Sequence, residues 1–224
     1  MPNFLEIKEG IRFDLFADAY DVNRGQYPIR TIVRARVIEV VRKHAPRVVV
    51  DVGCGTGTAL IELSDHITTG IGLDVSRRMV AVAAWKARLH RCENLQFQFG
   101  SFHDLNGDHD FWASECAPDL FMQNYAMHHL TQAEKREVLA SMACALDSTR
   151  DGMIVLGDLM FFEDPRGLES EHGIVGYDPS TDRPESVDTL TQILKDLGFR
   201  VETCPIHPLA GIIVARRSGV VRGQ

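Results

Sequence analysis

The sequence has 224 residues, of which 45% are hydrophobic and 25% charged, and its formal net charge is −7 at pH 7. A chain of this length buries roughly 70% of its unfolded surface, which supports one hydrophobic core, so a single domain over 1–224 is expected. The ordinary composition argues against a disordered, collagen-like or coiled-coil chain, and the acidic balance argues against nucleic acid as a partner.

The amino-terminal residues and the cysteines bear on the compartment. Glu6 and Glu9 lie where a secretory signal has its apolar stretch. The longest uncharged apolar run, 79–85, is too short to span a bilayer, so no membrane partner is expected. The cysteines are scattered without a C-x-x-C pair, which favours reduced thiols and a cytoplasmic protein. They are Cys54, Cys92, Cys116, Cys144 and Cys204.

Short apolar runs alternate with helical patterns from residue 47 onward, which is typical of a parallel α/β sheet. The predicted strands are 48–52, 70–75, 95–99, 118–123, 153–156, 199–206 and 211–215. Apolar periodicity predicts helices at 29–41, 60–63, 76–87, 131–146 and 186–197. The arginines on the first of these helices either form a solvated surface, which we favour, or bind an anion.

The residues within the strands predict their places in the sheet. The β-branched run 48–52 indicates a central strand covered on both faces, whereas the strict alternation of 95–99 indicates an edge. Pro205 cannot donate a ladder hydrogen bond, so its strand is also expected at an edge. The short connection between the last two strands predicts that they run antiparallel.

A glycine-rich loop, Gly53-Cys54-Gly55-Thr56-Gly57, lies between the first predicted strand and a helix. Glycines there permit a tight turn and the close approach of a ligand. Asp74 ends the next strand, where a carboxylate can accept hydrogen bonds from a ribose. The G-x-G-x-G spacing differs from the G-x-G-x-x-G dinucleotide pattern, and no P-loop lysine follows. An adenosine-containing ligand is therefore predicted, and an NAD-dependent oxidoreductase is a distant alternative.

These residues resemble the class I S-adenosylmethionine (SAM)-dependent methyltransferases. The resemblance extends over nearly the whole chain, and its motifs are 49–57, 71–76, 118–120, 127–130, 152–156 and 197–199, with 16–21 before them. It implies a Rossmann-like, doubly wound α/β fold with a seven-stranded sheet of order 3-2-1-4-5-7-6, strand 7 being antiparallel. It also implies SAM as cofactor.

The resemblance further implies a set of cofactor-binding residues. Asp51, Gly53 and Gly55 would line the methionine end and Asp74 would hold the ribose. An acidic residue often follows the third strand in the family, but this chain has Ser101 and Phe102 there, which leaves the adenine contact open. The full set is Asp51, Gly53, Cys54, Gly55, Asp74, Val75, Ser101, Phe102, Gln123 and Asn124.

Candidate catalytic residues lie near the open end of the sheet. His128 is suited to act as a base near neutral pH, although the histidine pair 128–129 can equally dock the following helix. The family motif points to a structural role for His129. Tyr125 follows the fourth strand without the prolines typical of methyltransferases that act on amino groups of nucleic-acid bases or glutamine. Tyr20 either covers the cofactor or packs against the sheet.

The remaining sequence leaves room for one acceptor pocket. The region 1–46 is expected to form a cap, and 160–184, too long for a simple connection, is expected to be a substrate loop or a loop pinned by hydrophobic clips. The histidines and acidic residues are not spaced to converge on a metal. We therefore expect a methyltransferase acting on a small molecule, with two alternatives: an enzyme of the same fold that releases methylthioadenosine, or a non-catalytic SAM-binding subunit.

Overall fold

The computed structural model describes residues 4–24, 27–105, 117–146 and 151–217, so Cys116 lies outside the described part. The strands are β1 (Val48–Val52), β2 (Thr69–Asp74), β3 (Leu95–Phe99), β4 (Leu120–Asn124), β5 (Met153–Leu159), β6 (Phe199–His207) and β7 (Ala210–Arg217). The helices are α1 (Phe4–Asp14), α2 (Tyr20–Arg24), α3 (Pro28–His44), α4 (Thr58–Leu63), α5 (Arg77–Leu89), α6 (Gln132–Ala145), α7 (His172–Val175) and α8 (Val187–Asp196).

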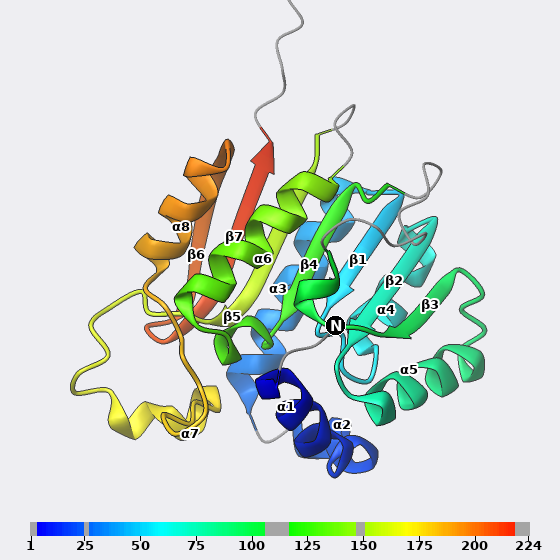
Figure 1. The fold of residues 1–224 in the computed structure, drawn as a ribbon, viewed down its shortest axis with the longest axis horizontal. Coiled ribbons are helices and arrows are strands. Elements are labelled where there is room, and N and C mark those ends of the chain that lie inside the picture. The colour runs from blue at the N-terminus through cyan, green and yellow to red at the C-terminus, as the bar shows by residue number, and fades with distance from the viewer. Residues whose placement is uncertain (1–3, 25–26, 106–116, 147–150, 218–224) are drawn as a thin grey trace, which may run out of the picture.

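The seven strands form one sheet in the order β3-β2-β1-β4-β5-β7-β6, which confirms the predicted fold class (Figure 1). The strands β1 to β5 pair in parallel, and β7 is antiparallel to both β5 and β6. The edge positions of β3 and β6 agree with the alternating pattern of the former and with Pro205 in the latter. A register shift in β6 between Pro205 and His207 accommodates the missing donor.

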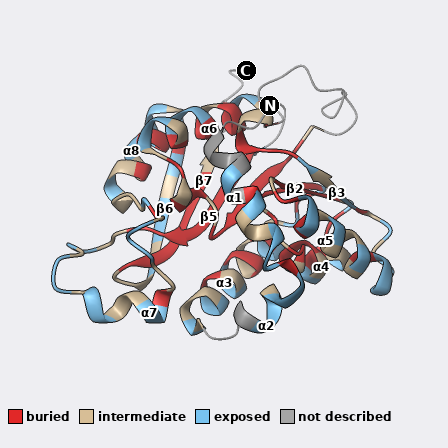
Figure 2. Cartoon of the chain, turned by 60° about the horizontal axis from the view of Figure 1, so that its bottom comes forward, coloured by how far each residue is buried: buried red, intermediate tan, exposed pale blue. Residues whose placement is uncertain are grey.

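Two hydrophobic clusters cover the two faces of the sheet, because neighbouring side chains of a strand point to opposite faces. Val48, Val50 and Val52 of β1 pack with α6 and α8, whereas Val49 packs with α3 and α4. Burial is therefore continuous along the central strands, as Figure 2 shows. The valine run was correctly interpreted as a strand covered on both sides.

The amino-terminal helix α1 was not predicted from the sequence. Its Gly10 lies directly against β2's end, since a Cβ there would come within 2.3 Å of the Val75 carbonyl oxygen. Asp14 at the end of α1 accepts hydrogen bonds from the Ser76 hydroxyl (2.5 Å) and the Arg78 backbone N–H (3.0 Å). The central Gly10 is unfavourable within a helix. Contacts with the first turn of α5 therefore stabilise α1.

The other differences lie at the ends of elements and within the long segment 160–184. β5 continues three residues beyond the predicted end at Leu156, and the segment 160–184 contains the short helix α7 and a 3-10 turn at Glu169–Glu171. The described cysteines Cys54, Cys92, Cys144 and Cys204 are free thiols, as expected. Among the described residues, none of the helices combines the length and apolar character that crossing a membrane requires.

Candidate cofactor and acceptor site

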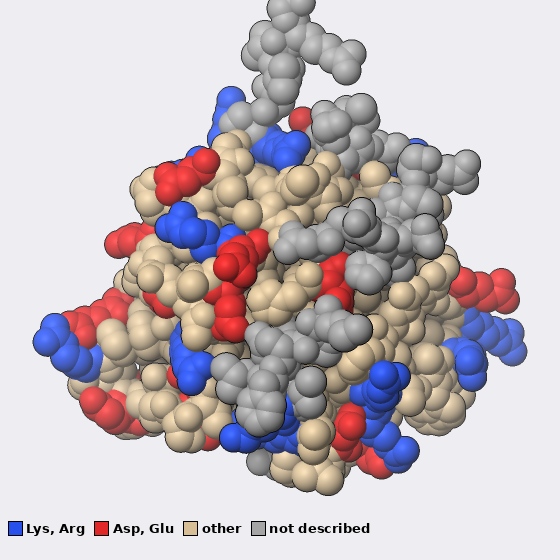
Figure 3. Space-filling view, viewed as in Figure 1, with Lys and Arg blue, Asp and Glu red and all other residues tan. Residues whose placement is uncertain are grey.

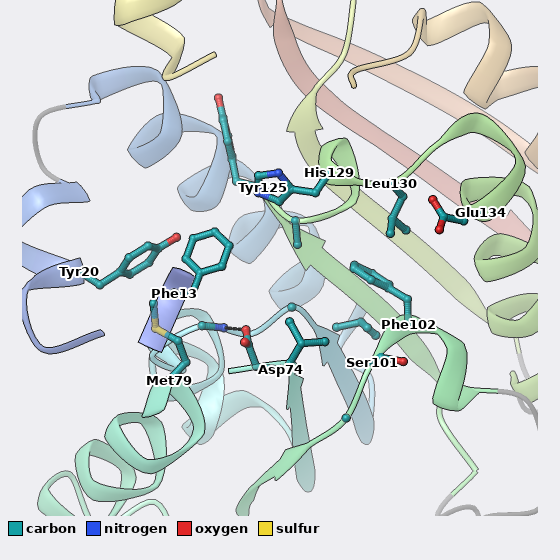
Figure 4. A pocket seen from close by; sticks show the side chains of 16 residues that line it. Phe13, Tyr20, Asp74, Met79, Ser101, Phe102, Tyr125, His129, Leu130 and Glu134 are labelled. Carbon is teal, nitrogen blue, oxygen red and sulfur yellow. Dashed lines mark hydrogen bonds between the residues drawn. The ribbon is translucent and has the colours of Figure 1, made fainter. Parts of the chain in front are cut away.

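An open cavity lies at the carboxyl ends of β1, β2 and β4 (Figure 4). This is the end of an open α/β sheet at which ligands bind. The lining residues are Phe13, Tyr20, Val52, Gly53, Gly55, Asp74, Val75, Met79, Gly100, Ser101, Phe102, Tyr125, Ala126, His129, Leu130 and Glu134.

The glycine loop forms one wall of the cavity, and its backbone requires glycine. Gly53, Gly55 and Gly57 have φ angles of 75°, 54° and 74°, in the left-handed region. A Cβ at Gly53 would lie 2.4 Å from the Ala126 Cβ, and one at Gly57 would lie 2.7 Å from the Phe97 ring. At Gly55 the space is open apart from the Tyr20 ring at 3.7 Å. Backbone at Gly55 is therefore accessible to a ligand.

Asp74 lies across from this loop with a carboxylate that two backbone donors fix in place. The Gly55 N–H donates to Oδ2 (2.8 Å) and the Ser76 N–H donates to Oδ1 (2.9 Å). Burial, only partly offset by these bonds, raises the pKa of Asp74 to about 6. Each oxygen keeps a further lone pair, so the carboxylate is suited to accept hydrogen bonds from a vicinal diol such as a ribose.

Aromatic side chains form the opposite wall and come from distant parts of the chain. Phe13 of α1 makes edge-on contacts with Tyr20 (centroids 6.3 Å apart) and with His129 (5.8 Å). Tyr125 has a φ of 53°, unusual for a residue other than glycine, and its N–H donates to the Gly157 carbonyl (2.8 Å). This backbone conformation places Tyr125 at the cavity directly after β4. The cavity thus has a polar side, formed by the glycine loop and Asp74, and an opposite aromatic side, which we call the aromatic roof.

The cap that carries Phe13 and Tyr20 is attached to the glycine loop by Asp21 of α2. Its carboxylate accepts hydrogen bonds from the Thr56 hydroxyl (2.7 Å) and the Lys86 amine (2.7 Å). Burial is the largest single effect on Asp21 and raises its pKa. The hydrogen bonds and the charge of Lys86 together outweigh it and hold the pKa below its ordinary value. Asp21 thus holds the segment that carries Phe13 and Tyr20 against the cavity.

The structure brings most of the predicted cofactor residues to the cavity, together with two predicted catalytic residues. Those that line it are Gly53, Gly55, Asp74, Val75, Ser101, Phe102, Tyr20 and Tyr125. Ser101 and Phe102, which follow the third strand where the sequence left the adenine contact open, both line the cavity. The Ser101 hydroxyl accepts a hydrogen bond from the His103 N–H (3.1 Å), and its own N–H donates to Asp104 (2.8 Å).

Four predicted cofactor residues do not line the cavity: Asp51, Cys54, Gln123 and Asn124. Gln123 is fully buried, and its Nε2 donates to Asp158 (3.0 Å) while its Oε1 accepts from the N–H groups of Ala126 (3.1 Å) and Met127 (3.3 Å). Its side chain therefore shapes the turn after β4. The Cys54 thiol is buried beside Gly72 of β2, and burial raises its pKa well above the ordinary value.

The two neighbouring histidines occupy different surroundings. His128 is 1% exposed and does not line the cavity; its Nδ1 contacts the Asp158 carboxylate, and burial lowers its pKa. His129 lines the cavity instead. Of the two, the structure thus places His128, the candidate base, away from the cavity and its neighbour in the 3-10 turn Met127–His129 at the cavity. Sequence spacing alone could not have distinguished them.

A buried carboxylate from the long segment joins these histidines. Asp182 is 7% exposed, and its Oδ1 lies 3.3 Å from Nδ1 of His129 and 3.9 Å from Nε2 of His128. The expectation that no histidine and acidic residues converge was therefore wrong, since Asp182 is 53 positions beyond His129 and reaches it only through the tertiary fold. In contrast, no residue of 160–184 lines the cavity, and rings such as Phe161 and Tyr177 pack on each other (6.0 Å).

Comparison with known proteins agrees with this geometry. Residues 49–149 match the family model described as "Methyltransferase domain". An uncharacterised methyltransferase of Bacillus pumilus is 27% identical over 217 residues, covering 92% of this chain and 95% of its own. One from Geobacillus thermodenitrificans is 30% identical over 156 residues, covering 66% of each chain. A carboxy-S-adenosyl-L-methionine synthase of Yersinia pseudotuberculosis is 29% identical over 117 residues, 51% of this chain and 47% of its own.

Solved structures share the fold at lower identity. The DhpI–SAH complex (SAH, S-adenosylhomocysteine) has a TM-score of 0.71 at 20% identity and covers 98% of this chain and 100% of its own. The magnesium protoporphyrin IX methyltransferase of Synechocystis with bound SAH has a TM-score of 0.63 at 22% identity, covering 84% and 83%. The solved structures agree in fold, while the methyltransferase model matched over residues 49–149, the methyltransferase relatives and the motifs support a class I SAM-dependent methyltransferase with SAM as its cosubstrate.

Proposed function

We propose that the enzyme methylates a small molecule that binds between the cofactor and the aromatic roof of the cavity. The observation that carries this proposal is the position of the cap. Phe13 and Tyr20 of the cap line the same cavity as Asp74 and the glycine loop, and Asp21 holds the cap in place. An acceptor must fit under these rings, which favours a small molecule with an apolar or planar part.

The surface around the site supports a small acceptor rather than a polyanion. In the view of Figure 3, basic and acidic side chains are interspersed over the described residues, without a continuous basic surface. The net charge of −7 also disfavours a polyanionic substrate. A nucleic-acid substrate would require a cluster of lysines and arginines along a groove.

The residues present fit SAM. The Asp74 carboxylate offers free lone pairs to a ribose, and backbone at Gly55 is open to a ligand. We assign ribose binding to Asp74, the loop wall to Gly53 and Gly55, and the adenine side to Ser101 and Phe102. Asp51, Cys54 and Asn124 are buried and do not line the cavity, so we assign them no direct contact with SAM.

Bound SAM supplies a methyl group on a positively charged sulfur, and the protein must orient the acceptor and exclude water. Tyr20 and Tyr125 present rings to the cavity, and aromatic faces attract a sulfonium charge. His129 is the histidine beside the proposed acceptor space. The His128 ring packs against the His129 ring (centroids 4.1 Å apart) on the side away from the cavity. We propose that the segment 160–184 supports the acceptor side through Asp182 rather than by contacting the acceptor.

The test is an acceptor screen with purified enzyme and SAM, in which SAH is quantified. Pools of small hydroxylated, amine and thiol compounds are compared with RNA and with protein extracts. We expect acceptor-dependent SAH from a small-molecule pool, reduced at least tenfold in Tyr20→Ala. SAH formation with macromolecules only would refute the small-molecule proposal. Release of methylthioadenosine without an acceptor would instead indicate the alternative chemistry of the same fold.

A further inference from the structure

We propose that His128, His129 and Asp182 bind a divalent transition-metal ion of the zinc type. Each residue offers one ligand atom, and the three atoms lie within 4.8 Å of one another. The cluster is directly behind the face of His129 that lines the cavity. The inference does not depend on the identity of the methyl acceptor.

The first argument concerns the proton on His128. Asp158 accepts hydrogen bonds from the His128 N–H (3.1 Å), the Gln123 amide (3.0 Å) and the Leu159 N–H (2.8 Å), and it also contacts Nδ1 of the His128 ring. A carboxylate surrounded by donors fixes the proton on Nδ1. The Nε2 lone pair then points away from Asp158. A carboxylate behind a ligating histidine is the usual arrangement in metal sites.

The second argument concerns what Nε2 faces. This atom is buried and makes no hydrogen bond, and the closest acidic atom is Oδ1 of Asp182 at 3.9 Å. A lone pair and a carboxylate oxygen repel each other unless a positive charge lies between them. Such a buried arrangement is costly without a cation.

The geometry of His129 indicates a shared centre rather than a direct hydrogen bond. Its Nδ1 is buried and makes no hydrogen bond, although Oδ1 of Asp182 is only 3.3 Å away. Two ligands of one ion point toward the ion instead of toward each other. Metal–ligand bonds of about 2.0–2.1 Å at tetrahedral angles put neighbouring ligand atoms about 3.3 Å apart. The longer separations in the cluster require a modest inward rotation of the rings.

In the described part of the chain, the side chains next to Asp182 supply no lysine or arginine that balances its negative charge. The Asp182 carboxylate accepts hydrogen bonds from the Thr181 hydroxyl (2.9 Å) and the Asp178 N–H (2.9 Å), and it faces the two imidazoles. The neighbouring Lys135 directs its amine to the carbonyl oxygens of Leu130 (2.7 Å) and Arg183. A bound cation or an extra proton on a histidine must therefore balance Asp182.

The ligand set selects the class of metal. Two imidazole nitrogens and one carboxylate suit Zn²⁺ and its neighbours Co²⁺ and Ni²⁺, whereas Mg²⁺ and Ca²⁺ prefer oxygen ligands only. Three protein ligands leave a fourth position for water or another group. An ion on Nδ1 of His129 places that ring's proton on Nε2. Its binding would thus fix both the orientation and the hydrogen-bonding character of a cavity-lining side chain.

The surrounding backbone holds the ligands in position without the ion. The Arg183 N–H donates to the His128 carbonyl (2.6 Å), and Lys135 joins the Leu130 and Arg183 carbonyls on either side of the cluster. The long segment and the turn after β4 are thereby held together next to the ligands. This preorganisation distinguishes the cluster from a chance meeting of surface side chains.

The test is metal binding by the full-length protein after chelation and buffer exchange. Zn²⁺ is titrated calorimetrically, and Co²⁺ is used as a spectroscopic probe of tetrahedral nitrogen and oxygen ligands. We expect one ion per chain with micromolar or tighter affinity and a rise in melting temperature. Asp182→Asn, which keeps the shape of the side chain, should weaken Zn²⁺ binding at least 30-fold, and Asp158→Asn should weaken it about 10–100-fold through the orientation of His128.

His207→Ala is the matched control, because His207 also pairs with an acidic residue, Glu171 at 3.4 Å, outside the cluster. It should bind Zn²⁺ as the unaltered protein does. Failure of the unaltered protein to bind Zn²⁺ or Co²⁺ below 100 µM would overturn the proposal and assign the balancing charge to a proton. Equal binding by Asp182→Asn would overturn it too. Neither measurement uses an acceptor, so failure here is separate from failure of the proposed function.

Discussion

Replacing Asp74 by Asn separates the stability of the fold from cofactor binding, and it should move them in opposite directions at neutral pH. Asp74 is 8% exposed, and burial raises its pKa to about 6 from an ordinary value of 3.8. An acid whose pKa is higher in the folded state destabilises the fold when ionised. This cost is complete above the folded pKa and disappears as the pH falls below the unfolded pKa.

The magnitude follows from the size of the shift. A difference of about two pH units corresponds to about 3 kcal/mol at pH 7.5 and about 1 kcal/mol at pH 4.5. Asn offers one acceptor oxygen, so one of the bonds from Gly55 or Ser76 is lost, at about 1–1.5 kcal/mol. The variant should therefore be about 1.5–2 kcal/mol more stable than the unaltered protein at pH 7.5 and no more stable at pH 4.5.

The assays are urea unfolding at both pH values and calorimetric titration with SAH. Because ribose hydroxyls donate to the carboxylate, Asp74→Asn should bind SAH at least tenfold more weakly at pH 7.5. The affinity of the unaltered protein should fall about tenfold per pH unit below the pKa of about 6. The exposed Asp65→Asn is the control. Equal destabilisation at both pH values, or SAH affinity within twofold of the unaltered protein, would refute this account.

Three further predictions concern the loop, the cap and the core. Gly57→Ala should lower the free energy of unfolding by about 2–4 kcal/mol in urea, because φ is 74° and the new Cβ meets the Phe97 ring at 2.7 Å; a loss under 0.5 kcal/mol would contradict this. Asp21→Ala should cost less than about 1 kcal/mol of stability, as the ion pair with Lys86 is partly exposed. It should nevertheless weaken SAH binding several-fold in calorimetry. Unchanged affinity would mean that contacts other than those of Asp21 hold the cap in place. Phe121→Ala should cost about 3–5 kcal/mol in the same unfolding assay, since the ring is fully buried; a small loss would show that the sheet face repacks.

Much of the sheet could be predicted because hydrophobic periodicity reports burial directly. The valine-rich run 48–52 belongs to a strand covered on both faces, and the alternation of 95–99 belongs to an edge. Pro205 could occupy only a position where a ladder donor is dispensable. The cofactor wall was predictable for a related reason: glycines with positive φ and an acid at a strand end are local requirements of the chain.

Which histidine lines the cavity was decided by tertiary structure. His128 and His129 are adjacent and chemically identical, and only the turn after β4 and its packing determine that the second one lines the cavity. Asp182 meets them across 53 positions of sequence, a contact that no local pattern records. The same holds for α1, whose glycine is explained by its approach to Val75. The sequence by itself determined the sheet and the cofactor loop, because backbone conformation and burial leave local signals. The roof and the histidine cluster arise from long-range packing, which does not.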